Sequence, residues 1–148
     1  MKKPFPYLLL ADDDPDDQET FLEAFSRLNV HAAVRTVNDG KELFEFLDGR
    51  PPDELPVMIL LDYKMPLVTA PEILERLSNH PLYAAIVKVV WSSSERSKDM
   101  QDCLRLGATA YFKKPSTAKE LDEIIRQIDA ILAQQAVLYK AGVDRSST

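Results

Sequence analysis

The stretch Val57-Met58-Ile59-Leu60-Leu61-Asp62 carries the strongest strand signal in the chain and determines the expected fold class. Its five apolar residues form a continuous run, without the alternation of apolar and polar residues that marks a strand with one wet face. Such a run is typical of a strand covered on both faces, as in a parallel sheet.

Four other short apolar runs are predicted to be strands, and segments with apolar residues at helical spacing separate them. The first helix is expected to begin after Asp14, a candidate N-cap, with Pro15 at its first position. The last is expected to begin at Thr117 with Glu120 completing a capping box, and to run to about residue 139. Five strands alternating with five helices predict a doubly wound α/β fold with a five-stranded parallel sheet. The other four strands are expected at residues 7–11, 33–37, 86–91 and 110–112.

The length of 148 residues suits one domain, expected over residues 7–140, with a leader at 1–6 and a tail at 141–148. A net charge of -6 argues against a nucleic-acid partner and against attachment to anionic membranes. Cys103 is the single cysteine, so no intramolecular disulfide can form and a reducing compartment is favoured. With no apolar run long enough for a signal peptide or a membrane span, a cytoplasmic location is expected.

Polar residues follow four of the expected strands, and in an open α/β sheet ligands bind beyond the carboxyl ends of the strands. We therefore expect several carboxylates, a hydroxyl group and an ammonium group at one edge of the sheet. The polar stretches are Asp12-Asp13-Asp14 after the first strand, Asp62 after the third, Ser92-Ser93-Ser94 after the fourth and Lys113-Lys114 after the fifth.

Carboxylates that converge repel one another unless a cation lies between them. Ligands that are all oxygen favour a hard ion such as Mg²⁺, with Mn²⁺ as a substitute. A carboxylate can also attack phosphorus, and phosphoryl transfer needs its equatorial oxygens to be neutralised. A metal ion, a lysine and a hydroxyl group together supply that neutralisation.

The sequence resembles the response regulator receiver family. The resemblance covers about residues 7 to 135 and rests on LLLADDDPDD, ILLDYKMPLVTAPEIL, VVWSSS and GATAYFKKP, which stand in family order with family-like spacing. It implies the flavodoxin-like receiver fold with strand order 2-1-3-4-5. It also implies a single-domain regulator, similar to chemotaxis regulators and phytochrome-associated regulators.

The resemblance implies a role for each acidic residue of the expected site. Asp62 stands at the position of the phosphoacceptor aspartate, which becomes a 4-aspartylphosphate. Asp13 would bind the metal directly and Asp12 mainly through water. The backbone carbonyl of Lys64 would be a further metal ligand.

The resemblance also implies the basic and switch residues. Ser92 matches the switch hydroxyl that hydrogen-bonds the phosphoryl group, and Lys114 matches the lysine that pairs with it. The bond between Lys114 and Pro115 is expected to be cis, as in the family. Tyr111 matches the aromatic switch position, although an aromatic residue in a short strand is often only part of the core.

Some residues depart from the family pattern. Ala70 stands where the family usually has glycine, and Thr69 where it often has aspartate or asparagine. Glycine tolerates a positive φ that alanine resists, so the loop after Asp62 is expected to take a different path. Lys64 and Ser94 occupy positions that in this family tune the loss of the phosphoryl group.

The expected function is that of a phosphoacceptor in a two-component phosphorelay, which catalyses only its own phosphorylation and dephosphorylation. Its expected partners are a histidine kinase or a histidine phosphotransfer protein and an unknown downstream protein. A homodimer through the apolar residues 137–139 is a further alternative. Three rival functions stay open: a degenerate receiver that acts as a phosphorylation-independent interaction module, a phosphohydrolase of the haloacid dehalogenase type, and a flavodoxin-like electron carrier.

Other conspicuous residues are interpreted as structural. Asp16 and Asp17 are first-turn residues favoured by the helix dipole. Trp91 and Cys103 are expected in the core, and His31 and His80 have no partner pattern that indicates a site.

Overall fold

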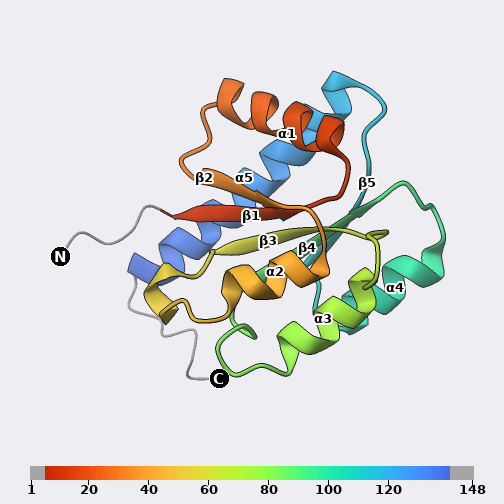
Figure 1. Cartoon of the computed structure of the whole chain (residues 1–148). Helices are drawn as coiled ribbons and strands as arrows, with labels where there is room; N and C mark the ends of the chain where they lie inside the picture. Colours follow the sequence, from red (N-terminus) through yellow and green to blue (C-terminus); the bar gives the residue numbers. More distant parts are fainter. Residues whose placement is uncertain (1–5, 141–148) are drawn as a thin grey trace.

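The computed structural model describes residues 6–140, and the side chains of residues 6–135. Five parallel strands form one sheet in the order β2-β1-β3-β4-β5, which confirms the predicted fold class and strand order (Figure 1). The strands are β1 (Tyr7–Ala11), β2 (Ala33–Val37), β3 (Met58–Asp62), β4 (Val87–Ser92) and β5 (Ala110–Lys113).

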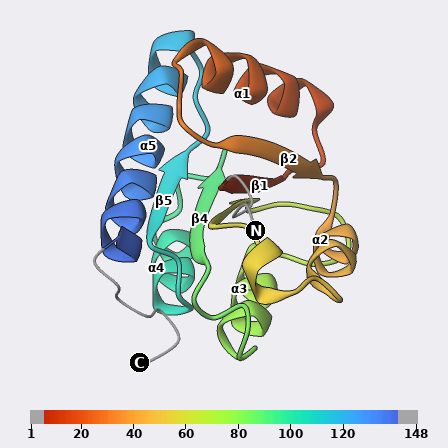
Figure 2. The ribbon, with the colours of Figure 1, turned by 90° about the vertical axis from the view of Figure 1, so that its left-hand side faces the viewer.

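Helices cover both faces of this sheet (Figures 1 and 2). One face carries α1 and α5, and the other carries α2, α3 and α4. The helices are α1 (Pro15–Arg27), α2 (Gly40–Leu47), α3 (Ala70–Ser78), α4 (Ser97–Arg105) and α5 (Ala118–Lys140), and a short 3-10 helix spans Pro52–Glu54.

The continuous apolar runs follow from this two-sided cover. In β1, Leu8 and Leu10 pack with α1 and α5, whereas Leu9 and Ala11 pack on the opposite face. Because successive side chains of a strand point to opposite faces, a strand that is covered on both faces needs apolar residues at every position. Every residue of β1, β3 and β4 is buried, including Lys88, whose Nζ donates to the carbonyl of Ala84 at 2.8 Å.

Capping follows the predictions with one difference. The side chain of Asp14 accepts hydrogen bonds from the backbone of Asp16 at 2.9 Å and of Asp17 at 3.4 Å, which confirms it as the N-cap of α1. Thr117 Oγ1 accepts from the backbone N–H of Glu120 at 3.1 Å. The difference is that the Glu120 carboxylate also accepts from the backbone N–H of Ser116, at 2.8 Å; hydrogen bonds from the backbone of Ser116 and of Thr117 both lower the pKa of Glu120.

The predicted cis bond was wrong, while the different path expected for the loop after Asp62 stays a prediction. No peptide bond of the described residues is cis, so the Lys114–Pro115 bond is trans, which is the lower-energy isomer of most X–Pro bonds. In the loop after Asp62 the left-handed residue is Leu67, with φ of 74°, and Ala70 is a buried first residue of α3. Position 70 therefore does not require glycine here, because the backbone turns three residues earlier.

Several predictions fall outside the described residues. The leader is described only at residue 6, and the tail at 141–148 is not described. The side chains of residues 137–139, proposed for a dimer, also lie outside the described part. Among the described residues, no helix combines the length and the apolar character that a membrane span requires.

Candidate functional site

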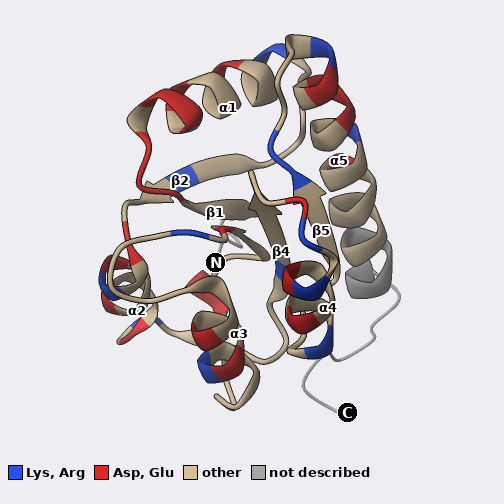
Figure 3. Cartoon of the chain, turned by 90° about the vertical axis from the view of Figure 1, so that its right-hand side faces the viewer, with Lys and Arg blue, Asp and Glu red and all other residues tan. Residues whose placement is uncertain are grey.

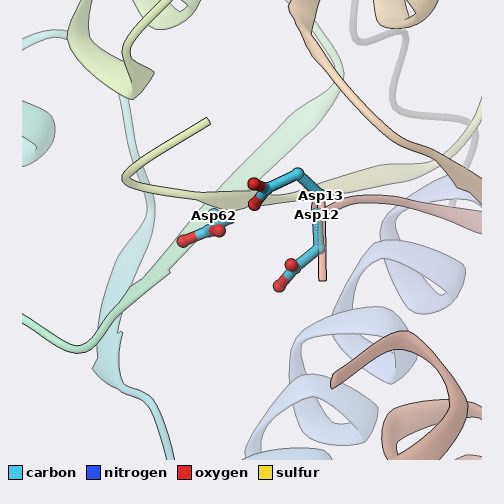
Figure 4. A group of neighbouring side chains, drawn as sticks. All are labelled: Asp12, Asp13 and Asp62. Carbon is cyan, nitrogen blue, oxygen red and sulfur yellow. The ribbon is translucent and has the colours of Figure 1, made fainter. Parts of the chain in front are cut away.

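Three carboxylates meet at the carboxyl-terminal edge of the sheet. Asp62 is the last residue of β3, and Asp12 and Asp13 directly follow β1, the neighbouring strand. One carboxylate oxygen from each residue lies within 4.8 Å of the others, and Figure 4 shows the three side chains gathered around a common space. Asp12 and Asp62 are buried, whereas Asp13 is exposed, so the cluster opens to solvent on one side.

Without a cation, ionising the buried carboxyl groups of this cluster costs free energy. Burial and the nearby charge of Asp12 raise the pKa of the Asp62 carboxyl to about 7, against the opposing effect of Lys114. Burial likewise raises the pKa of Asp12. Three carboxylate oxygens lie close enough together to be ligands of one metal ion, and two of these carboxyl groups are costly to ionise. Such a set fits a hard divalent cation such as Mg²⁺.

Lys114 reaches the same cluster from the end of β5. Its Nζ lies 3.0 Å from Asp12 Oδ2 and 3.3 Å from Asp62 Oδ2, and it lies 5.2 Å from the centre of the Trp91 ring. Burial alone would lower the pKa of Lys114, but its bonds to the carboxylates raise that pKa above its ordinary value. Its backbone N–H donates to the carbonyl of Ser92 at 2.7 Å, which fixes the chain after β5 beside β4.

Asp17 is a member of the cluster that the sequence analysis missed. Its Oδ2 accepts from Lys114 Nζ at 2.8 Å, across a sequence separation of 97 residues. The sequence analysis assigned Asp17 only to the helix dipole. Asp17 lies in the first turn of α1, which begins at the same edge of the sheet as Lys114, and this position could have indicated the contact. Figure 3 shows the acidic stretch that leads from β1 into α1.

The structure brings Ser92 and Tyr111 together beside the acidic residues. Ser92 is buried at the end of β4, and its Oγ accepts from the backbone N–H of Ser94 at 2.9 Å. Burial raises the pKa of the Tyr111 hydroxyl, and the nearby Ser92 hydroxyl opposes that effect. The Tyr111 hydroxyl is buried without a hydrogen bond of good geometry, and its ring packs edge to face on Tyr63 with centroids 6.5 Å apart.

Lys64 and Lys113 lie at the rim. The backbone N–H of Lys64 donates to Asp62 Oδ1 at 3.3 Å, while the expected metal-binding role of its carbonyl stays a prediction. Lys113 turns away from the cluster and pairs with Glu95.

The model of the response regulator receiver domain matches residues 8–126 of this chain, which is well over half of its length. The chain belongs to the response regulator receiver family. A rice protein, the two-component response regulator ORR12 of Oryza sativa subsp. japonica, is 30% identical over 123 residues, which cover 83% of this chain and 98% of that protein.

Solved structures of receivers are similar to this chain over most of their length. The phosphorylated cyanobacterial phytochrome response regulator RcpA has a TM-score of 0.76 and 26% identity, covering 85% of this chain and 92% of that one. The Mn²⁺-bound form of the response regulator Rcp1 has a TM-score of 0.74 and 23% identity, covering 84% and 92%, and this match shows the fold alone. The protein is therefore a receiver-domain signalling protein of two-component systems, and the electron-carrier and phosphohydrolase alternatives are set aside.

Proposed function

We propose that this receiver accepts a phosphoryl group on the Asp62 carboxylate in a reaction that depends on Mg²⁺, with Mn²⁺ as a substitute. The observation that supports this proposal is the meeting of Asp12, Asp13 and Asp62 within the span of one cation, with the Lys114 ammonium group beside them. Residues 7–140 form the receiver in this proposal, and it acts in the cytoplasm.

Asp13, Asp12, Asp62 and the Lys64 carbonyl would hold the metal. A bound Mg²⁺ would neutralise the phosphoryl oxygens during transfer. The raised pKa of Asp62, about 7, means that part of the metal-free protein carries a protonated and therefore unreactive Asp62 near neutral pH. A cation between the carboxylates favours the ionised form, which is the nucleophile.

In the proposed step, an Asp62 oxygen attacks the phosphorus of a phosphohistidine on a histidine kinase or a histidine phosphotransfer protein. The new P–O bond forms as the P–N bond breaks, and the imidazole nitrogen keeps the electron pair. The Lys114 ammonium, 3.3 Å from Asp62 Oδ2, and the Ser92 hydroxyl would contact the transferred oxygens. The protein would turn over no other substrate.

Phosphorylation would bias a two-state equilibrium in which Ser92 and Tyr111 move towards the phosphoryl group. Their neighbours α4, β5 and α5 would then present an altered face to a downstream protein. A homodimer through residues 137–139 is an alternative form of output.

Intact-mass measurement after incubation with acetyl phosphate and Mg²⁺ tests the proposal. We expect wild type to gain one phosphoryl group and Asp62→Ala to gain none. Asp16→Ala is the matched control, because Asp16 is an exposed acidic residue in the first turn of α1 near the cluster. No gain in wild type, or an equal gain in Asp62→Ala, would refute the assignment.

A Mg²⁺ titration separates the proposal from a degenerate receiver. Trp91 is the single tryptophan, and its ring lies 5.2 Å from Lys114 Nζ, so its fluorescence reports on the site. We expect a saturable change that is absent in Asp13→Ala. A flat titration together with no phosphoryl gain would favour the phosphorylation-independent interaction module.

A further inference from the structure

Asp99 is a buried carboxylate that neither the metal site nor the phosphoryl transfer uses. It lies in the first turn of α4, where an acidic residue is ordinarily a solvated partner of the helix dipole. Here only 9% of its surface is exposed, and its Oδ2 accepts from Ser94 Oγ at 2.9 Å. A buried charge is retained only with partners, so those partners indicate what it holds.

The second partner of Asp99 is Tyr63, the residue after the phosphoacceptor. Burial and a hydrogen bond to Asp99 raise the pKa of the Tyr63 hydroxyl to about 12. The ring of Tyr63 packs edge to face on Tyr111 of β5. Asp99 therefore ties α4 to the loop after β3 and to the aromatic pair beside the switch serine.

Ser94 connects Asp99 to Ser92. The backbone N–H of Ser94 donates to Ser92 Oγ at 2.9 Å, while the side chain of Ser94 donates to Asp99. Ser94 therefore links the side chain of Ser92 to the first turn of α4. Arg96, the N-cap residue of α4, provides no side-chain cap, but its backbone N–H donates to Ser94 Oγ at 3.2 Å, so Ser94 contacts this end of the helix through both Arg96 and Asp99.

We propose that Asp99 is a positioning residue that holds α4 in its resting arrangement by accepting from Ser94 and Tyr63, and that phosphorylation of Asp62 loosens this hold. The proposal rests on the function proposed above and adds the contact through which the site controls α4. If the contact exists only in the resting state, removing it shifts the equilibrium towards the active state.

Tyr63→Phe tests this with the least disturbance, because it removes one hydroxyl and keeps the ring on Tyr111. Beryllofluoride with Mg²⁺ is the probe, as a mimic of the phosphoryl group that favours the active state. We expect its apparent affinity to rise about tenfold, as expected for the loss of a hydrogen bond to a charged group from the resting state alone. Thermal stability should fall at the same time.

Tyr83→Phe is the matched control. It also removes a tyrosine hydroxyl that donates to a carboxylate, that of Asp48 at 2.7 Å, but it lies before β4 and therefore at the opposite edge of the sheet. We expect Tyr83→Phe to lower thermal stability without changing the affinity for beryllofluoride. An increase in affinity that both variants share would overturn the proposal, because it would show a general loosening.

Asp99→Asn provides a second, independent variant. It should raise the affinity for beryllofluoride as Tyr63→Phe does and should speed amide hydrogen exchange in α4, whereas Asp48→Asn should do neither. Unchanged or lower affinity in both Tyr63→Phe and Asp99→Asn would overturn the role of Asp99 while leaving the phosphoacceptor proposal intact. Failure of wild type to bind the probe with Mg²⁺ would instead remove the proposed function, and this inference with it.

Discussion

Replacing Asp62 by asparagine should raise the free energy of unfolding of the metal-free protein at neutral and alkaline pH. The Asp62 carboxyl has a pKa of about 7 in the folded chain, because it is buried and faces the charge of Asp12. Above that pH the wild-type cluster carries an extra buried negative charge. Asparagine keeps the shape of the side chain and removes the charge.

The size of the effect follows from the shift in pKa. A rise from 3.8 to about 7 corresponds to about 4 kcal/mol of differential stability. This is an upper limit, because the cost of ionising Asp12 and Asp62 is shared between them and Lys114 stays beside both. We expect Asp62→Asn to be more stable than metal-free wild type by about 2 to 4 kcal/mol at about pH 8.

The direction in which the free energy of unfolding changes with pH follows from the same shift in pKa. The pKa of Asp62 is raised on folding, so its contribution to stability is fully present below about pH 4. That contribution is lost as the pH rises through about 7. Wild type should therefore lose stability over this range, and Asp62→Asn should lose much less.

Urea denaturation in EDTA at about pH 5 and about pH 8, repeated with saturating Mg²⁺, measures both effects. Mg²⁺ should remove most of this difference at the higher pH, since binding to the folded wild type adds about 2.7 kcal/mol at a hundredfold excess over the dissociation constant. Asp16→Asn is the control and should follow wild type. Equal stabilities of wild type and Asp62→Asn at the higher pH without metal would refute the electrostatic reasoning.

Three further substitutions test other parts of the structure. Lys114→Met should lower the free energy of unfolding of the metal-free protein by about 3 kcal/mol near neutral pH, because it leaves buried carboxylates without their cation; an unchanged urea midpoint would contradict this. Leu67→Gly should raise thermal stability slightly, by about 1 kcal/mol or less, because Leu67 is 85% exposed and holds a left-handed φ of 74°; a loss of stability would show that its side chain makes a needed contact. Lys88→Met should stabilise the fold by about 1 to 2 kcal/mol in urea denaturation, because the ammonium of Lys88 is buried against the carbonyl of Ala84, and destabilisation would mean that this bond outweighs the desolvation.

The order of the strands and helices can be predicted from the sequence, because each strand or helix has its own local pattern of apolar residues. The runs around Leu8–Ala11 and Met58–Leu61 are apolar at every position because each strand is covered on both faces. Residues at the carboxyl ends of parallel strands share an edge of the sheet, so the sequence also predicts that Asp12, Asp13 and Asp62 lie together, as they do.

Contacts between side chains that are remote in sequence were decided only by the tertiary structure. Asp17 reaches Lys114, and Asp99 is buried against Ser94, although a sequence presents both carboxylates as ordinary first-turn residues. Burial and partners depend on how the helices pack against the sheet, which no local pattern contains. The same packing sets the pKa of Asp62, because desolvation and the charge of Asp12 act through space and not along the chain.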